Sequence, residues 1–507
     1  MYKSIDADVI IVGAGLSGLT AAYHLLKKEP YLRVIIFESS EQIGGRIPCS
    51  PFTNSSGQWV CSEQTQLLEL LEELHIPLIR TQTNPGNIVI KYKRISTAQK
   101  KKNILDFLTA TEKIQFTKFI LKVEIICRNI KEETKPTWID ELRKITLRTF
   151  IQDTVGSDTV RLVIDFMIYL TCGVKSSQVS ALFYVLFCIS TKGIIHQMIT
   201  EEKNLCELRL KNSLTNICEK LAERIGTYYI LTKENVLEVE CTDKYAEITT
   251  NLGSYCCHNV IVAVPPADIL KIKFTPDLPQ SKYDSISDVT SNIMTSFVAT
   301  YRKEFWMKLG LSGDIYSFDK DYSEGPIDFC CNITQFDIPA LYGLLFSEKI
   351  TSPSLPIYKR RILKQLSEYF GKEALNPVEY YERSWHNRSS RMFCWKEGNN
   401  KLVHDIEQVN RRIHWAGAET SNEWFGQMAG AVHSGIRAAL EVLCDLRPSV
   451  LTADDYMFLR PPQRTQKKPL ETYNDPIYSF LANWRSKLSI GLLILLIMYG
   501  LKTYLVN

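Results

Sequence analysis

The first forty residues contain the feature that most constrains how this chain can fold. Residues 8–12 are mostly apolar and β-branched, which predicts a short strand buried on both faces. Residues 17–28 carry apolar side chains at helical spacing, and residues 34–38 form a second apolar run. Glycines occupy the first turn and an acid ends the second run: Gly13, Gly15, Gly18 and Glu38. This order predicts a βαβ unit with a glycine-rich first turn.

Each of these four residues has a physical role in a nucleotide-binding turn. Gly13 permits a tight turn after the strand, and Gly15 has no side chain to block a pyrophosphate. Gly18 lets the helix pack closely on the strand, while the helix N-terminus offers free N–H groups to the phosphates. Glu38 is placed to hydrogen-bond a ribose hydroxyl. The pattern predicts a dinucleotide site, and the alternative is a glycine-rich turn without a ligand.

A second glycine pair bears on the choice between FAD and NAD. Gly44, Gly45 and Arg46 follow the second strand closely. Two glycines alone are compatible with an ordinary turn. After a βαβ unit, however, this tripeptide resembles the Gly-Gly-Arg extension of the amine oxidase superfamily of FAD enzymes. In that superfamily the glycines allow close backbone approach and the arginine faces the pyrophosphate, so the resemblance predicts FAD.

Segments late in the chain extend the resemblance. Residues 414–420 look like the strand and turn that contact the flavin ribityl chain, and residues 424–435 resemble the helix whose N-terminus points at the isoalloxazine. Residues 374–380 and 384–385 are similar to the flavin-containing monoamine oxidase family in particular. The further cofactor contacts that the resemblance implies are Val236, Gly417, Glu419, Met428 and Ala429.

The residues that surround the substrate depart from the family pattern. In monoamine oxidases two aromatic rings flank the amine, and a lysine holds a water near flavin N5. Here one aromatic wall remains as Trp395, whereas the second position is Gln427. The lysine position falls at Thr295 or Ser296, and a glutamine of the family's cavity is replaced by Cys206. We therefore expect intact FAD binding and altered amine handling.

Cys394 is the residue on which a covalent flavin would depend. It stands nine positions after Trp385, the spacing at which a monoamine oxidase cysteine holds the flavin through an 8α-thioether. The alternative is a buried free cysteine, which is the commonest fate of this residue type. Arg391, Met392 and Phe393 stand where the family has small residues. The resemblance thus implies FAD attached through Cys394, with the free thiol left open.

Composition excludes other classes of protein. The net charge of +4 on 507 residues is too small for a dedicated nucleic-acid binder, which concentrates basic residues on one face. The chain contains neither a Cys-x-x-Cys pair nor a His-Glu-x-x-His motif, so we expect no metal site. The N-terminus does not resemble a secretory signal, so we expect the 14 cysteines to lie in a reducing compartment.

The C-terminus predicts a membrane anchor. Residues 488–506 are nearly all apolar, and a helix of that length rises about 28 Å, close to the thickness of a bilayer core. Arg485 and Lys487 lie on the near side, and Trp484 suits the interface. The alternative is a buried core helix. The tail resembles those of monoamine oxidases, which implies the mitochondrial outer membrane with the catalytic body facing the cytosol.

These observations predict an α/β fold. We expect a Rossmann-type FAD-binding domain, an α+β substrate domain of mixed sheet and helices, and a C-terminal transmembrane helix. The predicted bounds are 1–90 with 215–270 and 405–445 for the FAD-binding domain, 91–214 with 271–404 for the substrate domain, 446–484 for a linker and 485–507 for the anchor.

The predicted function is oxidative deamination of an amine by an FAD-dependent amine oxidase. Hydride passes to flavin N5, O2 becomes H2O2, and the imine hydrolyses to an aldehyde. Its partners are then a small-molecule amine, O2 and a membrane, without nucleic acid, and a homodimer is left open. Two alternatives remain: an inactive flavin-binding relative with a regulatory role, and a flavin oxidase of polyamines or another substrate.

Overall fold

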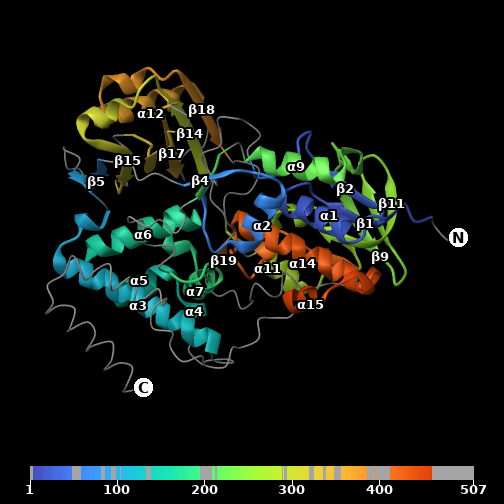
Figure 1. The fold of residues 1–507 in the computed structure, drawn as a ribbon. Coiled ribbons are helices and arrows are strands. Elements are labelled where there is room, and N and C mark those ends of the chain that lie inside the picture. Colours follow the sequence, from blue (N-terminus) through green and yellow to red (C-terminus); the bar gives the residue numbers. More distant parts are fainter. Residues whose placement is uncertain are drawn as a thin grey trace.

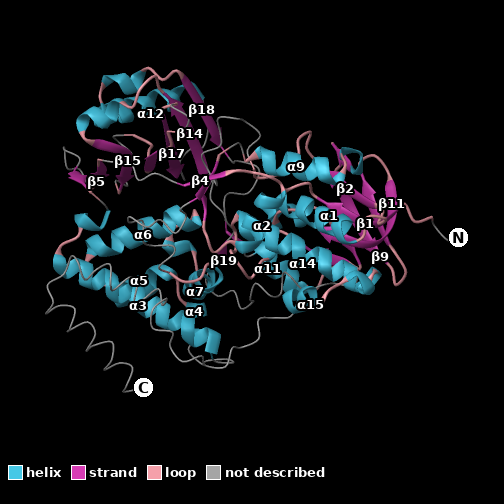
Figure 2. Ribbon diagram, viewed as in Figure 1, coloured by secondary structure: helices cyan, strands magenta, loops and turns pink. Residues whose placement is uncertain are grey.

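The computed structural model describes residues 4–47, 59–80, 86–92, 99–102, 104–132, 139–194, 208–211, 214–287, 289–290, 294–318, 325–334, 338–346, 355–384, 394–395 and 412–459. Figures 1 and 2 show two lobes that each contain a sheet, with a group of helices beneath the second lobe. The arrangement is a mixed α/β fold, as the sequence predicts.

The first lobe is built on an eight-stranded sheet. Its strands are β1 (Ala7–Val12), β2 (Val34–Glu38), β8 (Ile230–Thr232), β9 (Val236–Cys241), β10 (Ala246–Thr250), β11 (Ser254–Val262), β12 (Lys273–Thr275) and β20 (Ile413–Trp415). Their order is β12–β9–β10–β11–β1–β2–β8, and β20 also pairs with β11. β1 is parallel to β2 and β11, and β11 is parallel to β20. The carboxyl ends of these four strands therefore lie at one edge of the sheet.

Strand β1 is buried on both faces because it carries apolar side chains at every position after Asp8. Alternate residues belong to two separate hydrophobic cores, with Val9 and Ile11 on one face and Ile10 and Val12 on the other. This alternation is the period of two that a strand imposes on its side chains. The predicted buried strand is thus confirmed.

Helices cover the sheet. They are α1 (Leu16–Lys28), α2 (Thr65–Glu73), α9 (Thr215–Ile225) and α14 (Met428–Leu446), with the shorter α10 (Pro266–Ile269) and α11 (Gln280–Ser287). α1 and α14 pack so closely that a Cβ added at Gly435 would lie 2.5 Å from the Ser17 carbonyl oxygen. A helix contributed by the end of the chain thereby holds the first helix of the βαβ unit in place.

The second lobe contains a seven-stranded sheet. Its order is β18 (Glu379–Ser384), β14 (Met294–Thr300), β17 (Ala340–Phe346), β16 (Phe329–Asn332), β15 (Leu311–Ser317), β5 (Asn87–Lys91) and β6 (Gln99–Lys101). Helix α12 (Leu355–Phe370) packs on it through Ile362 and Leu366, which share a core with Phe297 and Trp306. A three-stranded sheet, β3 (Trp59–Val60), β7 (Leu208–Leu210) and β4 (Leu78–Arg80), lies between the lobes.

The helical group comprises α3 (Ala110–Glu132), α4 (Ile139–Lys144), α5 (Leu147–Thr154), α6 (Asp158–Cys172) and α7 (Ala181–Ser190). Hydroxyl side chains begin three of these helices, because Thr146, Ser157 and Ser180 each accept a hydrogen bond from the backbone N–H three residues later. The two-residue strands β13 (Val289–Thr290) and β19 (Cys394–Trp395) pair with each other.

The structure describes part of the predicted linker but not the predicted membrane anchor. The segment expected as a linker includes helix α15 (Ala453–Leu459), which an ion pair between Lys28 and Asp455, 2.7 Å apart, fixes to α1. No helix of the described residues is long and apolar enough to cross a membrane. The predicted anchor, 488–506, lies outside those residues. The domain bounds stay a prediction, and β5 straddles the one at residue 90.

Candidate functional site

The glycine turn after β1 leaves room for a ligand at one position only. Gly13 has φ +104°, and a Cβ there would lie 2.9 Å from the Ala263 carbonyl oxygen. A Cβ at Gly18 would collide with the Gly13 carbonyl oxygen. A Cβ at Gly15, in contrast, would meet nothing within 4 Å. The first and third glycines are therefore required by the fold, whereas the second borders open space at the N-terminus of α1, where a pyrophosphate fits.

Glu38 supports this turn from the end of β2. Its Oε2 accepts a hydrogen bond of 3.0 Å from the Ala14 backbone N–H, and its Oε1 accepts one of 2.9 Å from the Ser40 N–H. The side chain is buried. The carboxylate thus holds the glycine turn against the second strand, and its predicted contact with a ribose stays a prediction.

Gly44 and Gly45, the second set of glycines, lie directly against the glycine turn that follows β1. The Gly44 N–H donates to the Ala14 carbonyl oxygen at 2.8 Å, and Gly44 forms an isolated bridge with Gly15. Gly44 and Gly45 have φ of +105° and +59°, in the left-handed region that favours glycine. The chain then turns so that Arg46 follows at the same edge of the sheet.

Arg46 and Glu419 form a bidentate ion pair. Arg46 Nη2 donates to Glu419 Oε2 at 2.8 Å, and Nη1 contacts Oε1. Burial alone would lower the pKa of the Arg46 guanidinium, but the Glu419 carboxylate holds it above its ordinary value. Glu419 is almost fully buried, while Arg46 keeps 27% of its side chain exposed. The pair places a fixed positive group beside the glycine turns.

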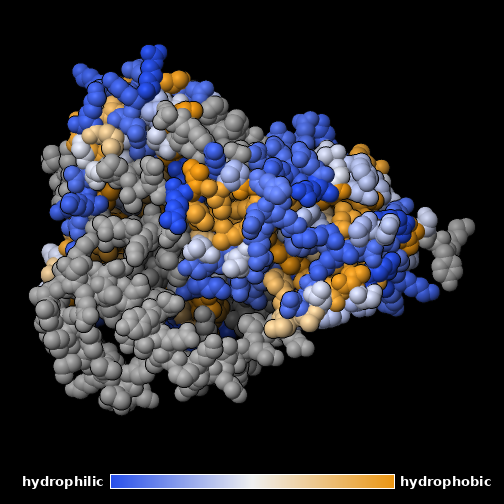
Figure 3. Space-filling model, in the orientation of Figure 1, coloured by the Kyte–Doolittle hydropathy of each residue, from blue (hydrophilic) through white to orange (hydrophobic). Residues whose placement is uncertain are grey.

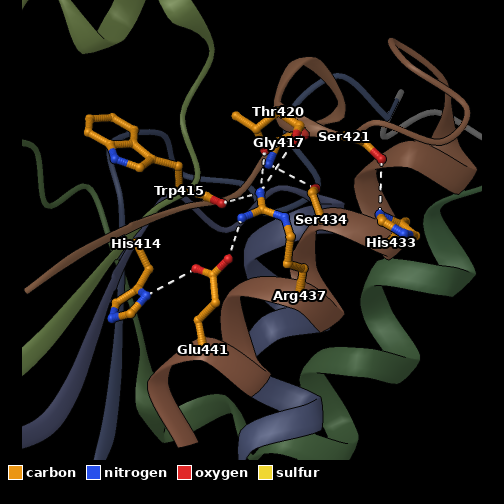
Figure 4. A network of polar contacts seen from close by, with 9 residues as sticks. All are labelled: His414, Trp415, Gly417, Thr420, Ser421, His433, Ser434, Arg437 and Glu441. Carbon is orange, nitrogen blue, oxygen red and sulfur yellow. Dashed lines mark hydrogen bonds and ion pairs between the residues drawn. The ribbon is translucent and has the colours of Figure 1, made fainter. Parts of the chain in front are cut away.

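A polar network holds the turn that carries Glu419. Gly417, with φ +143°, donates its N–H to Ser434 Oγ at 3.0 Å. Arg437 Nη2 donates to the Trp415 carbonyl oxygen at 2.9 Å and to Thr420 Oγ1 at 3.2 Å. Figure 4 shows how Arg437 reaches from α14 to both ends of this turn.

The same network continues toward the other edge of the sheet. Arg437 Nη1 donates to Glu441 Oε1 at 2.6 Å, and the other oxygen of Glu441 lies 3.1 Å from His414 Nδ1. Burial raises the pKa of the Glu441 carboxyl, but His414 and Arg437 outweigh burial and hold the pKa below its ordinary value. The buried carboxylate is thus paired, and the turn above it has a rigid support.

The loop between this turn and α14 docks on the helical group. Trp424 is buried with φ +52°, and its backbone N–H donates to the Ser190 carbonyl oxygen at 2.9 Å. Phe425 packs edge to face on Phe183 of α7, with ring centroids 5.6 Å apart. The first turn of α14 is therefore fixed by the helical group as well as by the first lobe.

Two glutamines meet where α14 begins. Gln427 precedes the helix, and its Oε1 accepts a 3.0 Å hydrogen bond from Gln64 Nε2, which precedes α2. Met428 and Ala429 form the first turn of α14, with Ala429 buried. Figure 3 shows apolar surface between the lobes around β4 and α2. The glutamine pair thus links the starts of α2 and α14.

The remaining predicted residues lie on the second lobe's strands or beyond the described chain. Thr295 and Ser296 are neighbours on β14, where Thr295 is buried and Ser296 is half-buried. Cys394 pairs through its backbone with Thr290, next to Trp395. The side chains of Cys394 and Trp395 lie outside the described atoms, as does all of Cys206. Val236 begins β9 and is buried.

A cavity of about 680 Å³ lies elsewhere. Its lining comprises Thr242, Asp243, Arg412, His414, Glu441, Cys444, Asp445 and Leu459. Arg412 precedes β20, so this cavity is at the amino ends of the parallel strands, opposite the glycine turns. The cavity therefore does not belong to the predicted cofactor site, since parallel sheets bind ligands at the carboxyl ends of their strands.

Comparison with known proteins decides the family. Residues 16–443 match the model of the flavin containing amine oxidoreductases. The chain belongs to this family. It is 26% identical to a flavin-containing amine oxidase of Oncorhynchus mykiss over 458 residues, which cover 87% of this chain and 86% of the relative. A probable flavin-containing monoamine oxidase A of Dictyostelium discoideum is 26% identical over 462 residues, covering 86% and 97%.

Solved structures share the fold of this amine oxidase family member. Putrescine oxidase bound to putrescine superposes with a TM-score of 0.78 at 23% identity, covering 86% of this chain and 99% of that one. Cyclohexylamine oxidase from Brevibacterium oxydans gives a TM-score of 0.76 at 21% identity, covering 87% and 99%. At these identities the likeness establishes the fold alone. Membership of the family confirms the predictions of a flavin-containing amine oxidase and of FAD as its cofactor.

Several residues that shape the site were not found from the sequence. Gln64 and Arg437 were not predicted, and Ala14, Trp424 and Ser434 lie inside predicted segments but were given no role of their own. Gln64 and Arg437 resemble ordinary polar residues on helices. The partner of Gln64 lies 363 residues away, and the partners of Arg437 lie in the predicted turn 414–420, whose conformation the sequence does not give. The only available signal was the position of Arg437 inside an otherwise apolar helix face.

Proposed function

We propose that the protein oxidises a primary or secondary amine with FAD as the hydride acceptor. When bound, FAD accepts the hydride from the amine's α-carbon and passes the electrons to O2, so that the amine becomes an imine and O2 becomes H2O2. Water then hydrolyses the imine to an aldehyde. The observation that carries the proposal is the pairing of Arg46 with Glu419 beside a glycine turn with open space at Gly15.

The residues of the chain bind and orient the cofactor in this proposal. The N–H groups at the start of α1 and the Arg46 guanidinium supply positive charge for the pyrophosphate. The start of α14, which Trp424 and Phe425 hold against the helical group, supplies N–H donors toward the flavin.

Two positions set this chain apart from monoamine oxidases. Thr295 and Ser296 occupy the stretch where the resemblance predicts a lysine, and neither carries a positive charge. Gln427 occupies the place of an aromatic ring. We therefore propose slow or shifted oxidase activity. The second candidate, a flavin-binding relative without turnover, rests on the same absence of a basic side chain at 295 and 296.

The visible spectrum of the purified, detergent-solubilised protein distinguishes these candidates. Under anaerobic conditions a panel of amines is added, and the flavin absorption band is followed. Bleaching by any amine demonstrates hydride transfer and supports the oxidase. A flavin band that no amine bleaches would replace the oxidase by the binding-only relative. Admitting O2 after bleaching then gives the reoxidation rate, which the loss of the lysine should lower.

We further propose that residues 488–506 anchor the protein in the mitochondrial outer membrane with its catalytic body in the cytosol. The support is the composition of this segment, an apolar run with Arg485 and Lys487 on its near side. A homodimer remains a separate proposal, which sedimentation of the solubilised protein would test.

A further inference from the structure

A short chain of hydrogen bonds fixes which end of the Gln427 amide, its oxygen or its NH2 group, faces Gln64. The Cys61 backbone N–H donates to Gln64 Oε1 at 3.2 Å, and Gln64 Nε2 donates to Gln427 Oε1 at 3.0 Å. A backbone nitrogen can only donate, so Gln64 must use its oxygen toward Cys61. Its NH2 group is then the part that faces Gln427, and Gln427 must accept with its own oxygen. The orientation of both amides follows from one unambiguous donor.

The two glutamines occupy equivalent positions on two helices. Gln64 is the N-cap of α2 and Gln427 is the N-cap of α14, and neither side chain caps its own helix. Gln64 is buried, with 3% of its surface exposed, whereas Gln427 is partly exposed. Within the described part of the chain, Gln427 Nε2 has no hydrogen-bond partner. The group that Gln427 presents outward is therefore an NH2 donor.

Burial makes this arrangement costly to reverse. If Gln427 turned over, two NH2 groups would face each other, and the buried Gln64 donor would lose its acceptor. The N-termini of α2 and α14 also meet here, and helix N-termini carry positive partial charge and free N–H groups. The exposed end of the Gln427 side chain thus donates hydrogen bonds and does not attract a cation.

We propose that Gln64 is a positioning residue that holds the Gln427 NH2 group toward the substrate, so that the protein prefers amines carrying a hydrogen-bond acceptor, such as a hydroxyl or ether oxygen. This inference rests on the proposed amine oxidation at the start of α14. The acceptor is not the reacting nitrogen, because its lone pair must form the C=N bond as hydride leaves the α-carbon. A donor on that lone pair would oppose the reaction.

The variant Gln64→Glu tests the proposal by reversing the polarity. A carboxylate still accepts from the Cys61 N–H but has no hydrogen to donate, so Gln427 must turn and present its oxygen outward. Gln66→Glu, two residues along α2 on a partly exposed position, adds the same charge without touching Gln427 and serves as the control. Gln427→Leu, which removes the donor, gives a second route to the same comparison.

Two matched ligand pairs provide the readouts, all with the FAD-loaded, full-length protein. For oxidation, 2-ethoxyethylamine is compared with n-pentylamine by the rate of anaerobic flavin bleaching at each amine concentration. For binding alone, 2-amino-2-methylpropan-1-ol is compared with tert-butylamine, which both lack an α-hydrogen, by the change in the flavin spectrum on titration. Preference is expressed as the ratio within a pair, so differences in amine basicity cancel between variants.

We expect the wild type and Gln66→Glu to favour the oxygen-bearing member of each pair by about fivefold, the effect of one hydrogen bond. Gln64→Glu and Gln427→Leu should lose this preference, with Gln64→Glu favouring the plain amine. Equal ratios in all four proteins would overturn the inference. If no amine bleaches the flavin, the oxidase proposal fails, yet the ratio for the pair without α-hydrogens still decides the role of Gln64.

Discussion

Arg46 and Glu419 are 373 residues apart in the sequence and form a two-point ion pair at the carboxyl edge of the first sheet. The pair connects the glycine turn that follows β2 with the turn that follows β20. Each partner belongs to a segment that the family resemblance assigns to FAD. Their contact therefore joins the two ends of the chain at the predicted cofactor site, and neither segment could form it alone.

Removing the carboxylate should destabilise the folded protein. In Glu419→Gln the Arg46 guanidinium loses its counter-charge, and breaking such a buried pair costs about 3 kcal/mol in the free energy of unfolding. The control Glu423→Gln removes the exposed pair with Lys192, whose atoms lie 3.5 Å apart, and should cost less than about 1 kcal/mol. Urea unfolding followed by tryptophan fluorescence measures both. Equal losses of unfolding free energy in the two variants would show that the pair of Arg46 and Glu419 contributes no more to stability than an exposed ion pair.

The second and third glycines of the motif should separate binding from folding. Gly18→Ala brings a Cβ against the Gly13 carbonyl oxygen and should lower stability by about 1–3 kcal/mol. Gly15→Ala meets no atom, so stability without FAD should change by less than about 1 kcal/mol, while the FAD dissociation constant rises about tenfold. Both are made in a Cys394→Ala background, which allows FAD to be exchanged. Unchanged FAD affinity in Gly15→Ala would place the pyrophosphate elsewhere.

Local features of the fold could be predicted from the sequence, because local spacing determines them. The βαβ unit follows from the apolar run at β1, the glycines after it and the acid Glu38. All of these lie within the first forty residues. The contact between Gln64 and Gln427 spans 363 residues, and no spacing rule relates the two. It depends on how α2 and α14 are brought together by the sheet, which only the folded chain reveals.

Two features of the structure were not expected from the sequence, and each has a physical cause. Residues 453–459 have a composition that suits a linker, yet they form α15, because Thr452 and Asp455 hydrogen-bond each other and Lys28 pairs with Asp455. Arg437 is a charged residue on a helix, and this residue type is usually exposed. Its guanidinium is in fact buried by three carbonyl and hydroxyl acceptors of a turn whose conformation the sequence does not give.

The C-terminal segment should direct a soluble protein to mitochondria. A fluorescent reporter carrying residues 480–507 is expected at the mitochondrial outer membrane, and protease added to intact mitochondria should remove the reporter. The matched control replaces Leu493 and Ile494 by aspartate, which makes burial in the bilayer costly by about 2–3 kcal/mol per residue. A wild-type tail that stays in the cytosol, or reaches the endoplasmic reticulum, would contradict the prediction.

Covalent attachment of FAD should depend on Cys394. The wild-type protein, precipitated with acid and washed, should keep its yellow colour, and its band on a denaturing gel should fluoresce. Cys394→Ala should release FAD under the same treatment. Cys444→Ala, which changes a partly exposed thiol at the opposite edge of the sheet, provides the control and should retain the flavin. Release of FAD from the wild type would leave Cys394 as a free cysteine.

His433 should make stability fall in mild acid. Burial lowers the pKa of its imidazole to about 4, from an ordinary value of 6.5. Above pH 6.5 the side chain is neutral in both the folded and the unfolded chain. Between pH 6.5 and pH 4 only the unfolded chain binds the proton, so the free energy of unfolding falls as pH falls, by about 3 kcal/mol at pH 4.

Two variants isolate this contribution from the carboxylates that titrate over the same range. His433→Gln keeps a donor for Ser421 but cannot take up the proton, so its stability relative to the wild type should improve by about 3 kcal/mol between pH 7 and pH 4. Ser421→Ala keeps the histidine and removes its 3.1 Å partner, so its difference from the wild type should change little with pH. Urea unfolding at half-unit pH steps measures both differences. If His433→Gln and the wild type lose stability in parallel down to pH 4, the imidazole is protonated in the folded protein and the buried, neutral state is wrong.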